Sequence, residues 1–129
     1  MTYRHKLAII ALILVVMTAI PVMAADPAAT KRVVAQSDDA SVLAIEVSVT
    51  GRAVHSVMIT DASGSIVDVV APKGWVGITS GERTLFRSDD KPIVSGEKVV
   101  FTVLTTNASA PLDVSYRGAK TPIGGKQSI

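Results

Sequence analysis

The chain has no cysteine among its 129 residues, so no disulfide can stabilise it. Small exported domains often depend on such cross-links. A chain of this size buries roughly 60–70% of its unfolded surface, which is enough for one apolar core. We therefore expect a single domain that is held together by packing alone.

Histidine and aromatic residues are also scarce. Beyond residue 24 the aromatic residues are Trp75, Phe86, Phe101 and Tyr116. The one histidine in that part is His55, with Met58 three positions on. A metal site needs three or four matched ligands, and these two side chains would point to opposite faces of a strand. We therefore expect no metal and no cofactor.

Charge of either sign is not in excess over most of the chain. Beyond residue 24 there are eleven basic and eleven acidic residues, because Arg4 and Lys6 account for the surplus of two. A nucleic-acid-binding face needs clustered lysine and arginine that displace counterions from phosphates. The neutral composition therefore predicts no nucleic-acid partner.

The first 24 residues are predicted to be a signal peptide. A basic start, MTYRHK, precedes an uncharged apolar run from Leu7 to Ile20, and Val22 and Ala24 supply the small residues of a cleavage site. Cleavage after Ala24 would release an exported chain. The alternative is an uncleaved membrane anchor, because residues 7–24 are just long enough to span a bilayer. Pro21 favours cleavage.

The rest of the chain carries the pattern of short strands. Residues 25–42 mix alanine, proline, serine and charge and are predicted to be a spacer, with a short edge strand around Val33. From Leu43 onward apolar residues alternate with polar ones, and turn residues interrupt them about every ten positions. The tail from Gly118 is turn-rich and gives only a weak pattern. We predict an all-β fold over residues 43–129, an antiparallel immunoglobulin-like sandwich of about seven strands.

Two local features of this pattern are specific enough to test. Residues 55–60 and 66–71 flank the turn DASGS, and we predict that they pair as a hairpin with Val67 and Val69 on one face. Trp75 follows Pro72 and Gly74, which end one strand and redirect the chain. Its ring is predicted to lie in the core between the sheets. The other predicted core residues are Phe86, Phe101 and Tyr116.

A longer motif begins at the same turn. It consists of Pro72, Gly74, Trp75, Phe86, Pro92, Ile93, Gly96 and Phe101. This series resembles a pattern in immunoglobulin-like modules of secreted and cell-surface proteins from bacteria and archaea. In those modules a proline–glycine–tryptophan turn precedes a strand, and a later proline–isoleucine loop leads into a long apolar strand. The resemblance implies an adhesive, spacer or scaffold unit, and it implies no reaction.

Other candidate sites have simpler structural explanations. The two SDD runs, at residues 37–39 and 88–90, could offer oxygens to calcium, but turn hydrogen bonds account for them. No GxSxG motif accompanies the single histidine, so we expect no catalytic residue and no enzyme. A role of Trp75 as a sugar platform is less favoured than core burial. The sequon at residues 107–109 marks Asn107 as an acceptor for glycosylation, should the host export through a glycosylating pathway.

These features favour a non-catalytic structural or adhesive module, secreted or held at the cell surface, with other extracellular or envelope proteins as partners. Strand addition would be one binding mode if residues 98–106 or the tail lie at a sheet edge. One alternative is a small extracellular protein that binds a sugar or a metal. The other is an accessory subunit that an uncleaved N-terminal helix anchors in a membrane.

Overall fold

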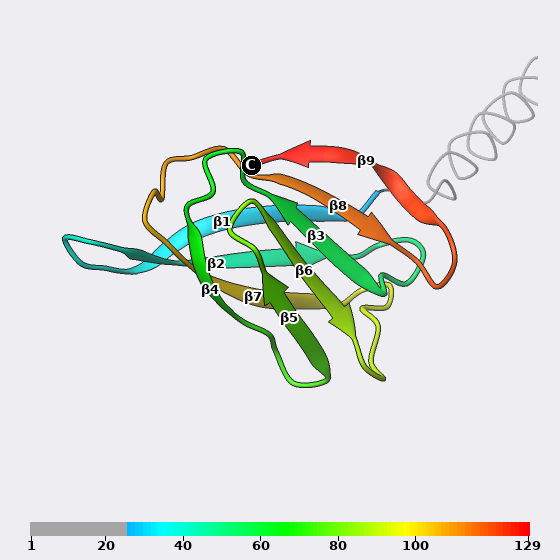
Figure 1. Cartoon of the computed structure of the whole chain (residues 1–129). Coiled ribbons are helices and arrows are strands. Elements are labelled where there is room, and N and C mark those ends of the chain that lie inside the picture. Colours follow the sequence, from blue (N-terminus) through cyan, green and yellow to red (C-terminus); the bar gives the residue numbers. More distant parts are fainter. Residues whose placement is uncertain (1–25) are drawn as a thin grey trace, which may run out of the picture.

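The computed structural model describes residues 26–129, so the predicted signal peptide and its cleavage site lie outside the described part of the chain. Within that part all regular structure is β-strand (Figure 1), and no helix is long and apolar enough to cross a membrane. The strands are β1 (Ala28–Gln36), β2 (Ser41–Ser48), β3 (Ser56–Thr60), β4 (Ile66–Val70), β5 (Trp75–Thr79), β6 (Arg83–Ser88), β7 (Lys98–Thr105), β8 (Asp113–Arg117) and β9 (Pro122–Ser128). The predicted all-β class is confirmed.

The strands form two antiparallel sheets that enclose the core. One sheet has four strands in the order β1-β2-β7-β4, and the other has five in the order β5-β6-β3-β8-β9. The segment at residues 98–106, considered above as an edge, supplies β7, which lies between β2 and β4. The tail supplies β9, which lies at an edge of the five-stranded sheet.

β1 and β9 are the strands that the sequence pattern does not predict in full. β1 occupies residues 28–36 of the segment expected to be a spacer and pairs with β2 along its length. β9 pairs with β8 in the turn-rich tail. Each is an edge strand that buries a single apolar side chain, Ala29 in β1 and Ile123 in β9. Apolar alternation is therefore absent from both, because neither has a fully buried face.

The predicted hairpin of β3 with β4 is wrong. β3 lies between β6 and β8 in one sheet, whereas β4 pairs with β7 in the other. The intervening turn does form, with Gly64 at a φ of 65°. Its centre is the buried carboxylate of Asp61, which accepts hydrogen bonds from the backbone N–H groups of Ser63 and Ser65, both at 3.0 Å. This turn carries the chain from one sheet to the other instead of folding it back on itself.

β4 also differs from the expected side-chain alternation. Its register against β7 shifts between Ile66 and Asp68. Because a bulge adds one residue to one strand, the side chains on either side of it no longer alternate. Ile66 is buried and Val69 packs against the core, but Val67 is 54% exposed. Val67 and Val69 therefore do not share a face.

An aromatic cluster lies at the centre of the core. The Trp75 ring meets Phe101 edge-on with 5.1 Å between centroids, and Phe86 and Phe101 are 4.6 Å apart. Gly74, at a φ of 85°, ends the preceding loop and lets Trp75 enter the core from the start of β5. Opposite the Phe86 ring stands Gly77, where a Cβ atom would come within 2.8 Å of that ring. We call the rings of Trp75, Phe86 and Phe101 the aromatic centre.

A polar contact joins the two sheets along their β1–β9 border. The side chain of Gln127 accepts a hydrogen bond from the N–H of Ala29 at 2.8 Å and donates one to its carbonyl at 3.2 Å. The same Gln127 oxygen accepts a hydrogen bond from the Tyr116 hydroxyl at 2.9 Å. Burial raises the pKa of Tyr116 to about 12. One amide therefore completes the backbone bonding of an edge strand and fixes it to the opposite sheet.

Candidate functional site

The polar residues singled out in the sequence do not converge on one site. His55 is half-buried just before β3, and Met58 lies exposed on the outer face of that strand. The two SDD runs belong to loops at opposite ends of the sandwich, one after β1 and one after β6. Across residues 26–129 no three histidine, aspartate or glutamate side chains gather in a way that could hold a metal ion.

The predicted core residues are all inside the sandwich. Trp75 is 8% exposed, Tyr116 3%, and both phenylalanines 0%. The exposed edge of Trp75 reaches a shallow hollow of about 650 Å³ that Pro72 and Lys91 also line. Because so little of its ring is open, a sugar cannot stack on Trp75 in this conformation.

Asn107 lies on the surface, in the loop that follows β7. Its side-chain oxygen accepts a hydrogen bond from the hydroxyl of Ser109 at 3.0 Å. The residue is therefore open to solvent in the folded domain.

A surface that sequence reasoning missed lies on the outer face of the five-stranded sheet. Ile78 on β5 stands opposite Leu85 on β6, and Leu85 stands opposite Met58 on β3. These three side chains are 68%, 39% and 39% exposed, respectively. They form one continuous apolar row across three strands, which we call the apolar stripe.

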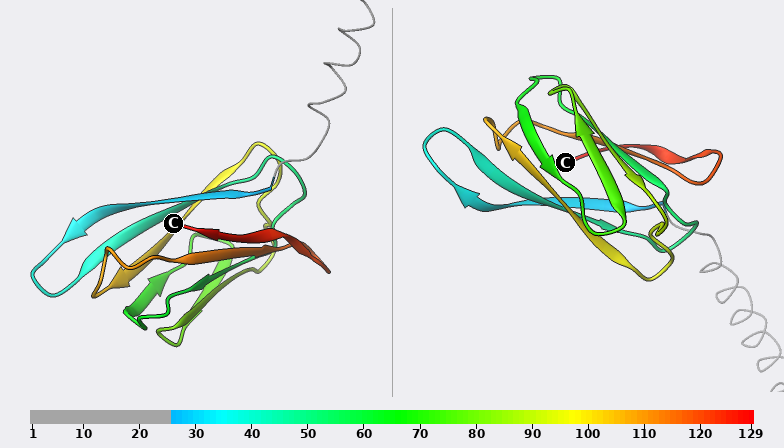
Figure 2. Two further views of the ribbon diagram at one scale, coloured as in Figure 1. Left: turned by 90° about the horizontal axis from the view of Figure 1, so that it is seen from above. Right: turned by 60° about the horizontal axis from the view of Figure 1, so that its bottom comes forward.

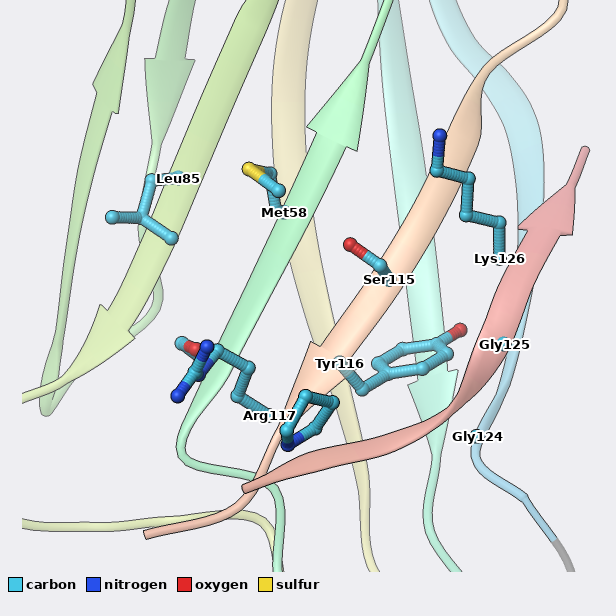
Figure 3. Close-up of a pocket in the computed structure, with 10 residues that line it drawn as sticks. Met58, Leu85, Ser115, Tyr116, Arg117, Gly124, Gly125 and Lys126 are labelled. Atoms are coloured by element: carbon cyan, nitrogen blue, oxygen red, sulfur yellow. The ribbon is translucent and has the colours of Figure 1, made fainter. Parts of the chain in front are cut away.

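The stripe is hollowed on both sides of Met58. One hollow of about 360 Å³ extends over β8 to β9, where Ser115 and Lys126 line it (Figure 3). A second hollow, of about 330 Å³, lies over β5 and β6 and includes Ile78 and Arg83. At the β9 side Gly124 and Gly125 add no side chain, which leaves that part of the sheet uncovered.

Cations surround the apolar stripe. On the strands of this face the basic residues are Arg83, Arg87, Arg117 and Lys126. The acidic residue on these strands is Asp113, on β8. Within residues 26–129 the one ion pair joins Lys98 to Glu46 on the other sheet. None of the four cations around the stripe is therefore neutralised by a contact within the described chain.

At the end of the molecule where the β1–β2 hairpin turns, acidic residues are the only charged residues of the loops. The loops that meet there, residues 37–40, 61–65, 80–82 and 106–112, contain no lysine or arginine. Asp38 and Asp39 are exposed at the hairpin turn. The hairpin extends beyond the other loops (Figure 2), and Val33 and Val34 on it are 48% and 51% exposed. We call residues 33–39 the hairpin tip.

In these two parts of the surface the charge is therefore segregated, although the composition is balanced. The sequence does contain one sign of the apolar stripe, since Leu85 stands between Arg83 and Arg87 on the outward-facing side of β6. That single residue could not indicate a stripe, because the alignment of Leu85 with Met58 and Ile78 depends on the register of three strands.

No protein-family model matches the chain, and no curated protein matches its sequence. Among solved structures it is similar to part of a GH20 exo-β-N-acetylglucosaminidase from Vibrio harveyi in complex with N-acetylglucosamine, with a TM-score of 0.54 and 6% identity over 81% of this chain. An inactive mutant of that enzyme gives 0.53 and 7% over the same share. The chain spans only 17% of that enzyme's length. At this identity the likeness concerns the fold alone.

Proposed function

We propose that this chain is an exported, non-catalytic interaction module that binds a protein partner through the outer face of its five-stranded sheet. The observation that carries the proposal is the apolar stripe bordered by cations that form no ion pair within the described chain. An exposed apolar row with a charged border is the usual composition of a protein-binding surface. Such a surface supports a structural or adhesive role, which requires no catalysed reaction.

The spatial order of the strands supports an immunoglobulin-like assignment. The order β1-β2-β7-β4 matches the A-B-E-D sheet of a nine-stranded immunoglobulin domain, and β5-β6-β3-β8-β9 matches its C″-C′-C-F-G sheet. The connection differs, because the chain reaches β4 before β5 and β6, whereas strand D follows C′ and C″ in that family. The tryptophan also differs, since it lies on β5 and not on the strand that corresponds to C.

The location outside the cytoplasm rests on the N-terminal sequence. A basic start, an apolar run and small residues before Ala25 favour export and cleavage. N-terminal sequencing of the protein from its native host should find Ala25 as the first residue. An intact N-terminus in the membrane fraction would support the anchored accessory subunit instead.

Binding to the cell envelope tests the proposed surface directly. The purified protein is incubated with envelopes from its native host, and the retained fraction is measured. We expect Leu85→Lys to reduce retention, because it places a charge in the middle of the apolar stripe. Val100→Lys, on the outer face of the four-stranded sheet and of similar exposure, is the matched control. Equal retention of wild type and Leu85→Lys would rule out this face as the binding site.

Sugar binding is the contrasting function, and Trp75 fluorescence separates the two. The structure of the similar enzyme contains N-acetylglucosamine, so this sugar is a suitable probe. Because the Trp75 ring is enclosed by the core, we expect its emission to be blue-shifted and unchanged by the sugar. A red-shifted emission that responds to the sugar would favour a small ligand-binding protein.

A further inference from the structure

We propose that the partner of the apolar stripe is a second copy of this chain, whose hairpin tip docks on the stripe. The proposal rests on the proposed function, since it names the occupant of the same surface. The two surfaces lie on different sheets of one molecule, with the core between them. The tip of a molecule therefore cannot cover its own stripe and is available to another copy.

The two surfaces are complementary in charge. The hairpin tip carries Asp38 and Asp39, both exposed, and no basic residue. A third hollow beside Met58, of about 190 Å³, is lined by Arg83 and Lys126 together with one acidic residue, Asp113, so its border carries a net positive charge. Opposite charges of this kind guide association and fix the orientation of the two partners. Nucleic acid would match only the cations, whereas the tip also matches the apolar stripe.

The two surfaces also match in apolar character. Val33 and Val34 on the hairpin are about half exposed, although valine is usually buried. Beyond residue 31 the burial pattern of β1 contains no buried position, so both faces of this part of the strand are open. The hairpin is therefore a narrow protrusion with two exposed valines close to its acidic end. On the stripe, the apolar row would contact the valines, and the basic residues at its border would face the aspartates.

The symmetry of this contact determines the assembly. Different surfaces meet at the interface, so each bound molecule leaves one free tip and one free stripe. Such heterologous contacts produce open chains or rings. A hairpin end buries less area than the ~1,200 Å² of the smallest stable interfaces, so we expect weak association that requires a high local concentration. Crowding at a cell surface would supply that concentration.

Charge reversal provides the test. The tip-reversed variant carries Asp38→Lys and Asp39→Lys, and the face-reversed variant carries Arg83→Glu and Lys126→Glu. The full chain is expressed, purified in mild detergent and studied by sedimentation velocity over a range of concentrations. We expect wild type to associate, and each variant alone to associate at least about tenfold more weakly, because like charges then face each other.

The decisive sample is the mixture of the two variants. Each reversed tip then meets a reversed face, and each native tip meets a native face, so the mixture should associate as wild type does. The matched control is Asp89→Lys with Asp90→Lys, which makes the same change in charge at the opposite end and should leave association unchanged. Raising the ionic strength from about 0.05 M to about 0.5 M should weaken the assembly.

Three results would overturn the proposal. They are a wild-type chain that stays monomeric at every concentration, a mixture that fails to associate, and a control variant that dissociates as the tip-reversed one does. A monomeric wild type that binds vesicles of anionic lipid through Arg83 and Lys126 would assign the face to a membrane. If wild type is monomeric but Leu85→Lys still loses envelope binding, self-association is excluded and the proposed function stands.

Discussion

The two sheets are joined at two places by different kinds of contact. At the aromatic centre, three rings from three strands exclude water between the sheets. At the β1–β9 border, one amide makes two directional hydrogen bonds across the gap to Ala29 and accepts a third from Tyr116 in its own sheet. The first contact depends on volume and apolar area, whereas the second depends on the position of individual atoms. We therefore expect the two places to respond differently to mutation and to pH.

Removing a ring from the aromatic centre should have the largest effect. Phe101→Ala removes the ring that contacts both of the others, and such truncations typically cost ~3–5 kcal/mol. Domains of this kind are stable by only ~5–15 kcal/mol, and no disulfide supports this one. Chemical denaturation should show near-complete loss of stability. Val100→Ala, one position along β7 and facing outward, is the control and should be mild.

Trp75→Ala tests the edge of the same cluster. Its ring contributes burial next to Phe101, so we expect a loss within the same range as for Phe101→Ala. A Trp75→Ala protein of wild-type stability would mean that the ring is not part of the core in solution. The loop from Pro72 to Gly74 would then become the first place to look for a ligand.

Alkaline pH should weaken the β1–β9 border selectively. The pKa of the Tyr116 hydroxyl is about 12 in the folded chain, against 10.0 in the unfolded chain. Above pH 10 the unfolded state loses this proton while the folded state keeps it, so stability falls as pH rises from 10 through 12. The full loss corresponds to roughly 2–3 kcal/mol, at ~1.4 kcal/mol per pKa unit. Denaturation curves recorded at several pH values give the free energy of unfolding at each pH. In Tyr116→Phe this free energy should not show the fall between pH 10 and pH 12.

Removing the amide should have a smaller and more local effect. Gln127→Ala leaves the N–H and C=O of Ala29 without their partners, at a cost of ~1–3 kcal/mol. Hydrogen exchange at the Ala29 amide should become faster, while exchange in β7 stays slow. Gln36→Ala, at the exposed end of β1, is the matched control. Unchanged exchange at Ala29 would show that the bond to Gln127 does not protect this amide in solution.

The same contrast explains which parts of the fold could be predicted from the sequence. β2, β7 and β8 each have one buried face, so their apolar residues alternate and the strands are visible. Of the aromatic centre, Phe101 on β7 follows from that alternation. The bond from Gln127 to Ala29 joins residues 98 positions apart, and nothing in the local pattern of either strand indicates it. The β3–β4 pairing was mispredicted for a related reason, because a turn such as 61–65 fixes a change of direction but not the sheet that the next strand joins.

The candidate site was less predictable than the core. Each outward residue of the apolar stripe is an ordinary exposed side chain when its own strand is considered. The stripe exists only because the register aligns Ile78, Leu85 and Met58. The hairpin tip depends likewise on β1, which the sequence pattern predicts only as a short edge strand. A balanced composition also hides the separation of acidic and basic residues, since it sums them over the whole chain.

Arg83→Ala should change stability least of all the substitutions considered. Arg83 is exposed and has no ion pair within the described residues, so its loss should shift the free energy of unfolding by no more than ~0.5 kcal/mol. The same substitution removes a cation from the hollow beside Met58, and it should therefore weaken association of the chain with itself. Denaturation and sedimentation of one preparation measure both effects. A loss of stability as large as that of Gln127→Ala would place the Arg83 stem among the contacts that hold the sheets together, and the residue could then no longer be regarded as part of a free binding surface.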